Sequence, residues 1–266
     1  MTVGERRARF RELHAAEGIF VMPNAWDEGS ARLLAWSGFD AIATTSAGFA
    51  WTLGRNDQNV TLDELVTHVE RLSAATDLPL SVDSERLFAP DPAGVAETVR
   101  LLAAAGAAGC SIEDYDPATG RIDPVDVAAE RVAAAAAAAH AGERMVLTAR
   151  AENHLHGVDD LDDTIARLVA YETAGADAVY APGLTDPADI RAVVTAVSVP
   201  VNVLALPDTP AVAELGQLGV RRVSTGSLLA SAAYGALLAG ARELRTQGSS
   251  DYARAGLPRD VRTAAF

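Results

Sequence analysis

The chain has 266 residues, of which 36 are acidic and 22 basic, giving a net charge of −14, and 49% are hydrophobic. These values predict one soluble domain over residues 1–266, of the size that an α/β barrel takes. An acidic chain without a basic patch is expected to bind neither nucleic acid nor a membrane, and no apolar run is long enough for a membrane span. With a single cysteine, Cys110, and no signal peptide, we expect a cytoplasmic protein.

Eight short apolar runs bounded by turn residues predict strands at 19–23, 41–46, 78–83, 109–114, 145–150, 178–182, 199–204 and 221–226. Helical patterns separate these runs, and several of the helices end in glycine just before the next strand, as in SGFDAIA and AGADAVYA. This eightfold alternation predicts an α/β fold of the (β/α)8 TIM barrel type. A doubly wound open sheet is the alternative, but no glycine-rich loop follows the first predicted strand.

The helix predicted after the eighth strand reads SLLASAAYGALLAGARELRTQG, and its apolar residues run nearly all round it. Such a helix must be buried, either by the barrel or by a partner subunit. We therefore expect a homo-oligomer, a dimer or a tetramer. Residues 249–266 follow this helix as a C-terminal tail.

All 22 basic residues are arginine, and the chain contains no lysine. Schiff-base aldolases and pyridoxal phosphate enzymes need a lysine amine, and a Walker-type nucleotide site needs its P-loop lysine. The sequence excludes these three classes of site.

Polar residues stand at the carboxyl ends of the predicted strands, where barrels of this type form their active sites. Asp83, Glu85 and Glu113 follow neighbouring strands, and several buried carboxylates close together require a cation, for which oxygen ligands suit Mg²⁺ or Mn²⁺. Asp83 and Glu85 are two positions apart and are expected to point to the same side. The alternative is that these acids are solvated strand ends or helix caps.

Arg150 follows the fifth predicted strand and is expected either to clamp a substrate carboxylate or to form an ion pair with one of these acids. The loop after the eighth strand, residues 224–227, either caps the last helix or binds an anion. Three histidines are predicted to lie on the surface and Cys110 in the core; the histidines are His14, His68 and His140.

With these residues identified, the sequence resembles the isocitrate lyase and phosphoenolpyruvate mutase family from about Phe20 to Gly248. The resemblance is carried by MPNAWDEGSARLLAWSGFDAIATTSAGFAWTLGRND, LPLSVDSE, GCSIED, LTARAE, PVNVL and GVRRVSTGSLLASAAYGALL. It implies a Mg²⁺-dependent barrel whose last helix is swapped between subunits. It also implies chemistry through the enolate of an α-keto acid held on the metal.

The resemblance assigns roles to individual residues. Asp83 matches the direct metal ligand, Glu85 and Glu113 match acids that hold the ion directly or through water, and Asp57 matches an acid near the metal. The implied substrate-binding residues are Thr45, Ser46, Ala47, Gly48, Arg150 and Asn202.

Two segments depart from the family's pattern. Lyases carry a loop of the Lys-Lys-Cys-Gly-His type after the Ile-Glu-Asp of strand four, and mutases place Lys and Asn there, whereas this chain reads IEDYDPATGRIDP. The family's acidic pair followed by Gly-Tyr-Gly reads DSERLFAP in this chain. Tyr115, Asp116 or His154 could supply the missing base, or each could be an ordinary loop residue.

These observations predict a Mg²⁺-dependent carbon–carbon lyase or decarboxylase that acts on a small 2-oxo or 2-hydroxy carboxylic acid through a metal-bound enolate. Arg150, Asp57 and Tyr115 are the predicted catalytic residues. One alternative is a phosphoenolpyruvate mutase or phosphonopyruvate hydrolase, although the chain lacks the polar gating loop of such enzymes. Another is a barrel that binds a metal or ligand and has lost its chemistry.

Overall fold

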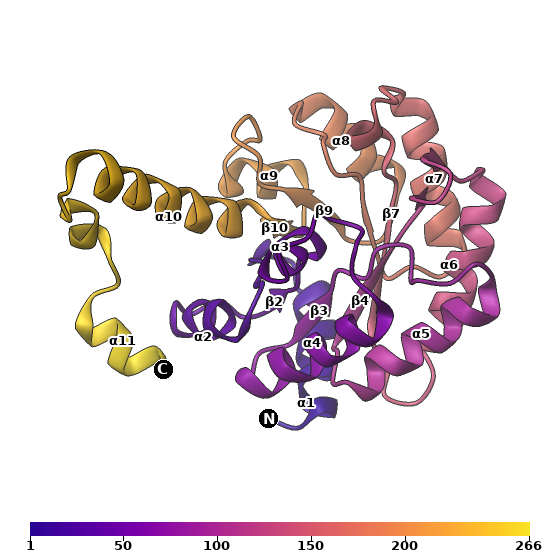
Figure 1. The fold of residues 1–266 in the computed structure, drawn as a ribbon. Helices are drawn as coiled ribbons and strands as arrows, with labels where there is room; N and C mark the ends of the chain where they lie inside the picture. Colours follow the sequence, from indigo (N-terminus) through magenta and orange to yellow (C-terminus); the bar gives the residue numbers. More distant parts are fainter.

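The computed structural model describes all residues from Met1 to Phe266, and eight parallel strands form its centre (Figure 1). The strands lie side by side in the order β1-β10-β9-β8-β7-β4-β3-β2. A bridge between Asn24 and Ala43 connects the two edges, so the sheet is nearly closed. The strands are β1 (Phe20–Met22), β2 (Ile42–Ala43), β3 (Leu80–Val82), β4 (Gly109–Glu113), β7 (Val146–Arg150), β8 (Ala178–Tyr180), β9 (Val201–Leu204) and β10 (Arg222–Ser224). The predicted (β/α)8 barrel is confirmed, and each predicted strand segment contains one of these strands.

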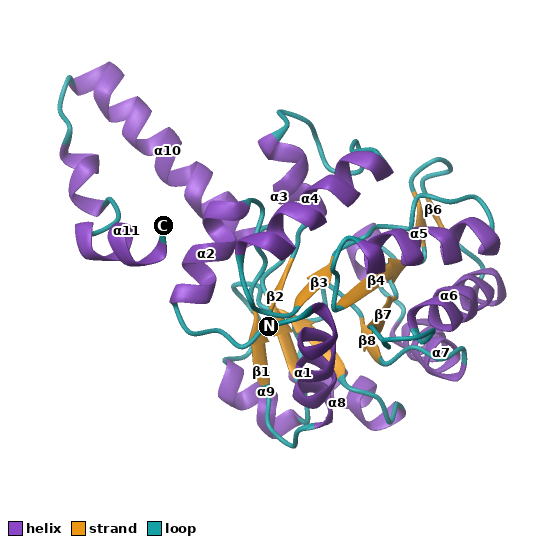
Figure 2. Cartoon of the chain, turned by 90° about the horizontal axis from the view of Figure 1, so that it is seen from below, coloured by secondary structure: helices purple, strands orange, loops and turns teal.

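Helices surround the strands, as Figure 2 shows. The side chains of Thr61, Asp91 and Asp160 each accept a hydrogen bond from a backbone amide in the first turn of the next helix, which fixes where α4, α5 and α7 begin. The apolar faces of these helices pack on the outer face of the sheet and form the main core. The helices of this layer are α2 (Glu28–Trp36), α4 (Leu62–Ala75), α5 (Pro92–Ala104), α6 (Val125–Ala139), α7 (Leu161–Thr173), α8 (Pro187–Ala196) and α9 (Val212–Leu218).

The first helix, α1 (Val3–Ala15), lies across the N-terminal end of the barrel. Phe10 and Leu13 pack there in one apolar cluster with Ala41, Ala108 and Val146, which lie at or just before the first residues of three strands. Since α1 covers this end, a ligand reaches the barrel interior from the carboxyl ends of the strands.

One row of inward-facing side chains runs across neighbouring strands. The strand register pairs Glu113 with Arg150, Arg150 with Tyr180, Tyr180 with Asn202, and Asn202 with Arg222. Partner residues in a parallel ladder point to the same face of the sheet. A barrel of this type usually fills its interior with branched apolar residues, so a polar row of this length marks the interior as the place of a site.

Two local elements differ from the sequence prediction. The segment after β4 forms a small antiparallel hairpin of β5 (Tyr115–Asp116) and β6 (Arg121–Ile122). The predicted strand 41–46 ends early, because the short helix α3 (Ser46–Thr52) begins inside it with Thr45 as its cap. Both differences lie at the carboxyl ends of strands, where the polar candidates gather.

The C-terminal part of the chain leaves the barrel as an arm (Figure 1). Helix α10 (Leu228–Gln247) extends away from the strands, and the tail forms η2 (Asp251–Ala255) and α11 (Arg259–Ala265), which returns to lie beside α2. Only Ala230 and Gly240 of α10 are buried. The barrel therefore does not cover this helix, and the predicted burial of α10 by the barrel is wrong. No helix of the structure has the length and apolar character needed to cross a membrane.

The surface prediction is wrong for two of the three histidines. His68 on α4 is buried, and its ring stacks on Phe49 with centroids 3.8 Å apart. His14 on α1 is half-buried and contacts Arg222 inside the barrel. His140 is half-exposed and contacts Asp177. Cys110 is buried in the core, as predicted.

Candidate active site

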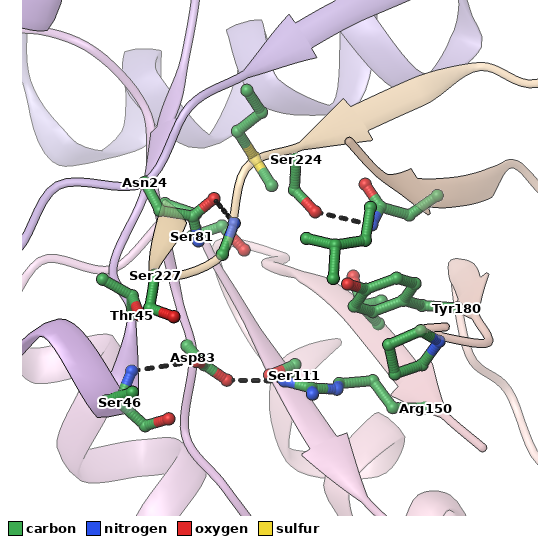
Figure 3. Close-up of a pocket in the computed structure, with 18 of the residues that line it drawn as sticks. Asn24, Thr45, Ser46, Ser81, Asp83, Ser111, Arg150, Tyr180, Ser224 and Ser227 are labelled. Carbon is green, nitrogen blue, oxygen red and sulfur yellow. Dashed lines mark hydrogen bonds and ion pairs between the residues drawn. The ribbon is translucent and has the colours of Figure 1, made fainter. Parts of the chain in front are cut away.

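A cavity of about 180 Å³ opens at the carboxyl ends of the strands (Figure 3). Seven sequence-predicted residues line it, namely Thr45, Ser46, Ala47, Asp57, Asp83, Arg150 and Asn202. The polar lining residues that sequence reasoning did not select as site residues include Asn24, Ser81, Ser111, Thr148, Tyr180 and Arg222. Of the remaining predicted residues, Gly48, Glu85, Glu113 and Tyr115 are not part of the lining.

Arg150 is the centre of an ion-pair network. Its Nη1 atom lies 2.7 Å from Oδ1 of Asp83 and 2.9 Å from Oε1 of Glu113, and its Nε atom lies 2.7 Å from Oε1 of Glu152. Its guanidinium carbon lies 5.1 Å from the centroid of the Tyr180 ring. Burial works to lower the pKa of Arg150, but Glu113, Glu152 and Asp83 outweigh it and hold the pKa well above its ordinary value. The ion pairs predicted as one alternative for Arg150 are therefore present.

The site contains more carboxyl groups than one guanidinium can pair with, and those left without a cation are held partly protonated. Burial raises the pKa of Glu85 to about 8, with the charges of Asp83 and Asp57 adding to the effect. Burial also raises the pKa of Asp57, where Asp83 is again a contributor. One carboxylate oxygen of Glu85, Oε1, is buried without a hydrogen-bond partner. This oxygen could accept a hydrogen bond or coordinate a cation.

The backbone after β3 turns sharply to bring Glu85 into this group. Glu85, Leu87 and Phe88 all have left-handed backbone conformations, with φ of 49°, 61° and 53°. The alternation of side chains along a strand, from which Asp83 and Glu85 were expected on the same side, does not apply here, because β3 ends at Val82 and Glu85 is not extended. Each such residue costs of order 1–3 kcal/mol and persists only where the surrounding structure holds it.

Several contacts hold this strained segment. Leu87 is fully buried. The carboxylate of Asp123 lies 2.7 Å from Nη2 of Arg86, and Nη2 of Arg131 donates to the carbonyls of Arg86 and Ala89 at 2.8 and 2.9 Å. Asp123 and Arg131 thus hold residues 86–89 in place.

The loop after β2 is tied to Asp83. The backbone amide of Ser46 donates to Oδ2 of Asp83 at 2.9 Å, and the amide of Asp83 donates to the hydroxyl of Thr44 at 2.8 Å. A Cβ atom at Gly48 would lie 2.5 Å from Cγ2 of Thr45, so only glycine fits there. Figure 3 shows Ser46 and Arg150 on opposite sides of Asp83.

The three candidate bases lie outside the cavity. Tyr115 stacks on His156 with ring centroids 3.6 Å apart. Asp116 accepts hydrogen bonds within its own hairpin, and His154 lies between Thr164 and Asp159.

The loop after β10 is held by Asn24. The Oδ1 atom of this residue accepts hydrogen bonds from the amides of Thr225 and Gly226, both at 2.9 Å. Ser227 makes no side-chain capping bond to α10. Capping of α10 by Ser227 is therefore not observed. The amides of Thr225 and Gly226, which belong to the loop considered for anion binding, already donate to Asn24.

Comparison with known proteins assigns the chain to a family. The profile of the family described as phosphoenolpyruvate phosphomutase matches residues 10–245. The chain therefore belongs to this family. It is a lyase of the isocitrate lyase and phosphoenolpyruvate mutase superfamily, as the sequence predicted.

Individual members of the superfamily are similar to this chain over most of their length. A protein assigned as 2-methylisocitrate lyase 2 of Corynebacterium glutamicum is 31% identical, covering 96% of this chain and 83% of its own. Oxaloacetate decarboxylase of Paraburkholderia xenovorans is 33% identical, covering 84% and 75%. A solved structure from Burkholderia cenocepacia, described no further than as a lyase or mutase, is 49% identical with a TM-score of 0.94, covering 98% and 95%.

Proposed function

We propose that this superfamily member is a Mg²⁺-dependent carbon–carbon lyase or decarboxylase that acts on a small 2-oxo or 2-hydroxy carboxylic acid. The observation that carries the proposal is the crowding of carboxylates around Arg150 at the mouth of a polar cavity. These carboxylates belong to Asp57, Asp83, Glu85, Glu113 and Glu152.

The donor set fits a hard divalent cation. Asp83, Glu85 and Glu113 would hold the ion, and the unpartnered oxygen of Glu85 is the type of ligand that Mg²⁺ or Mn²⁺ takes. No three such side chains converge on one point in the structure, and Arg150 stands between Asp83 and Glu113, so a metal would have to displace this guanidinium from at least one of them. A phosphonopyruvate hydrolase with the same fold, 24% identical with a TM-score of 0.85, was solved with Mg²⁺ and oxalate.

When bound, the ion would stabilise the negative charge that develops on the oxo oxygen of the substrate. The chain's own residues would do the rest. Ser46 and Ala47 line the wall of the cavity next to Asp83 and would hold the substrate carboxylate. Arg150, released from one of its acids, would face the substrate with its free donors.

Decarboxylation agrees best with the positions of the candidate bases. Cleavage of a 2-hydroxy acid needs a base at the substrate hydroxyl, whereas decarboxylation of a 2-oxo acid needs only the ion and a carboxylate clamp. Tyr115, Asp116 and His154 all lie outside the lining of the cavity. The relatives assigned as oxaloacetate decarboxylases support the same choice.

A thermal-shift titration with oxalate, which mimics the pyruvate enolate, tests the proposal. We expect oxalate to raise the melting temperature only when Mg²⁺ is present, because the two ligands share one site. Asp83→Ala should abolish this response, whereas Asp126→Ala, an exposed acid on α6, should leave it intact. An unchanged response in Asp83→Ala would refute the metal assignment, and no response in the wild type would favour a barrel without chemistry.

The reaction itself is tested by following oxaloacetate with and without Mg²⁺. We expect the protein to accelerate the release of CO₂ and pyruvate in a manner that chelation by EDTA abolishes. Rates equal to those of Mg²⁺ alone would contradict decarboxylation, and 2-hydroxy diacids would then be screened for aldehyde or keto acid products.

A further inference from the structure

A guanidinium without a counter-charge lies inside the barrel. Arg222 on β10 is 2% exposed. Its Nε atom donates to Oδ1 of Asn202 and its Nη2 atom to the hydroxyl of Thr148, both at 2.9 Å, and Nη1 lies 2.9 Å from Nε2 of His14. Burial lowers the pKa of His14 to about 3, so this imidazole is neutral at pH 7 and accepts from Arg222. All three partners of Arg222 are therefore uncharged.

The other buried arginines have negative partners or backbone carbonyls. Arg150 and Arg167 contact carboxylates. Arg6, Arg7 and Arg131 donate to backbone carbonyls of loops and helix ends. Arg6 and Arg131 also contact no carboxylate, but their partners are backbone carbonyls, whereas Arg222 donates to neutral side chains that line the cavity. Burial lowers the pKa of Arg222 to about 10, which still leaves it charged at pH 7. An unbalanced buried charge is unfavourable for folding, so its presence calls for a functional explanation.

Arg222 lines the same cavity as the candidate active site. The inward-facing row of the strand register starts at the mouth with Arg150 and continues through Tyr180 and Asn202 to Arg222, which reaches the helix α1 that covers the far end. Three carboxylates balance Arg150, whereas none contacts Arg222. Arg222 is therefore the unbalanced positive charge of this cavity.

We propose that Arg222, with Thr148 and Asn202, forms a subsite for a second carboxylate of the substrate and so makes the enzyme prefer dicarboxylic over monocarboxylic acids. The guanidinium fork matches the planar geometry of a carboxylate, and the neutral hydroxyl and amide neighbours leave the charge of Arg222 available for it. The inference rests on the proposed function, since the first carboxylate of the substrate is placed beside Ser46 at the mouth.

Two 2-hydroxy acids that differ by one carboxylate, L-malate and L-lactate, test the subsite. Melting temperatures are measured against the concentration of each acid in the presence of Mg²⁺. We expect malate to stabilise the wild type at a concentration about tenfold or more below that of lactate, since a buried charge-assisted hydrogen bond contributes roughly this factor. If malate and lactate stabilise the wild type at equal concentrations, the proposal is wrong.

Two variants remove the subsite in different ways. Arg222→Met removes the charge, and Asn202→Asp gives Arg222 a permanent carboxylate at the position of its 2.9 Å partner. We expect the malate preference to fall to near unity in both. Arg221→Met is the matched control, because this neighbouring arginine does not line the cavity, and it should keep the preference.

Retention of the preference in Asn202→Asp would refute the subsite even if Arg222→Met did not fold. The response to oxalate and Mg²⁺ separates the two proposals. If oxalate stabilises the wild type but malate and lactate act alike, only the subsite is wrong. If oxalate also has no effect, the proposed function itself fails.

Discussion

Asp114 connects the ends of the two strands that carry most of the candidate site. It is buried beside Glu113 at the end of β4 and accepts a hydrogen bond from the backbone amide of Glu152 after β7 at 2.8 Å. Tyr171 donates to its other oxygen at 2.6 Å, and Arg167 lies 3.2 Å from the same atom. Burial raises the pKa of Asp114 while these three partners oppose the effect. The position of Glu152, and through it of Arg150, depends on this residue.

Replacing Tyr171 by phenylalanine should therefore destabilise the protein. The change removes one hydrogen bond to a buried carboxylate and leaves that oxygen with Arg167 alone, which we expect to cost about 1.5–3 kcal/mol of unfolding free energy. Urea denaturation measures the loss. Tyr252→Phe, at an exposed tyrosine of the arm, is the control and should change the stability by less than about 0.5 kcal/mol. Equal effects of the two changes would show that the Asp114 contact contributes nothing.

The buried histidine on α4 predicts a dependence of stability on pH. Burial lowers the pKa of His68 from 6.5 to about 4, although Asp27 works against the shift. The unfolded chain therefore binds a proton at this residue at a higher pH than the folded chain. The contribution of His68 to stability is fully present above pH 6.5 and is lost as the pH falls towards 4.

Urea denaturation of the wild type at pH 7 and pH 4.5 checks this expectation. His68→Gln and His68→Phe cannot be protonated, so both should lose less stability than the wild type over this interval. His14 acts in the same direction with a pKa of about 3, so a residual decrease is expected in both variants. A decrease as large as that of the wild type in both would contradict the assignment of this effect to His68.

At the scale of elements, the strained turn between β3 and α5 depends on Arg131 of α6. This buried guanidinium donates to the carbonyls of Arg86 and Ala89, on either side of the left-handed Leu87 and Phe88. Arg131→Met would leave both carbonyls without this donor, and we expect a loss of about 1–3 kcal/mol in unfolding free energy. Since the turn also places Glu85, the concentration of Mg²⁺ needed for stabilisation should rise.

Arg100→Met on α5 is the control for this change, because Arg100 is exposed and pairs only with Glu97 one turn away. This control should change the free energy of unfolding by less than about 0.5 kcal/mol. Melting curves in a Mg²⁺ titration report both quantities together. A destabilised Arg131→Met with an unaltered Mg²⁺ response would show that the turn holds the fold but not Glu85.

Elements with a long-range pattern could be predicted from the sequence, and short or strained ones could not. Strands such as β7 and β9 follow from apolar runs between helices, and the acids after them follow from where a barrel forms its site. The two-residue strands β5 and β6 are too short to show a period. The direction of Glu85 depends on left-handed residues that are not glycine.

The interior residues of the candidate site could not be predicted from the sequence either. Asp83 and Arg150 stand at strand ends and were found there, but Arg222 belongs to the run RRVSTG, where nothing in the sequence tells which arginine faces inward. His68 lies on the apolar stripe that Leu65, Val69 and Leu72 form on α4, so the helical period does indicate its burial. The surface prediction failed because it weighed the polarity of the residue over its place in this period, and the ring of Phe49 that covers His68 comes from another helix.

At the scale of the whole molecule, the C-terminal arm exposes apolar surface that a monomer would leave in water. Leu237 and Leu238 on α10 are each 65% exposed, and Leu244 is 51% exposed. The arm extends away from the barrel (Figure 1), and although η2 packs against α10, these leucines stay exposed. A contiguous apolar surface of this kind is typical of a subunit interface. We therefore expect a homo-oligomer in which a second subunit covers α10.

Size-exclusion chromatography with light scattering measures the mass directly, and the wild type should elute as a dimer or tetramer. Leu237→Glu combined with Leu238→Glu places two charges where the partner would pack, and we expect these changes to shift the protein to the monomer. Leu101→Glu, at an exposed leucine on the outer face of α5, should leave the mass unchanged. Because α10 begins directly after the β10 loop that Asn24 holds, dissociation should also weaken the response to oxalate and Mg²⁺. A monomeric wild type, or an assembly that survives both glutamates, would place the interface elsewhere and leave the exposure of α10 without an explanation.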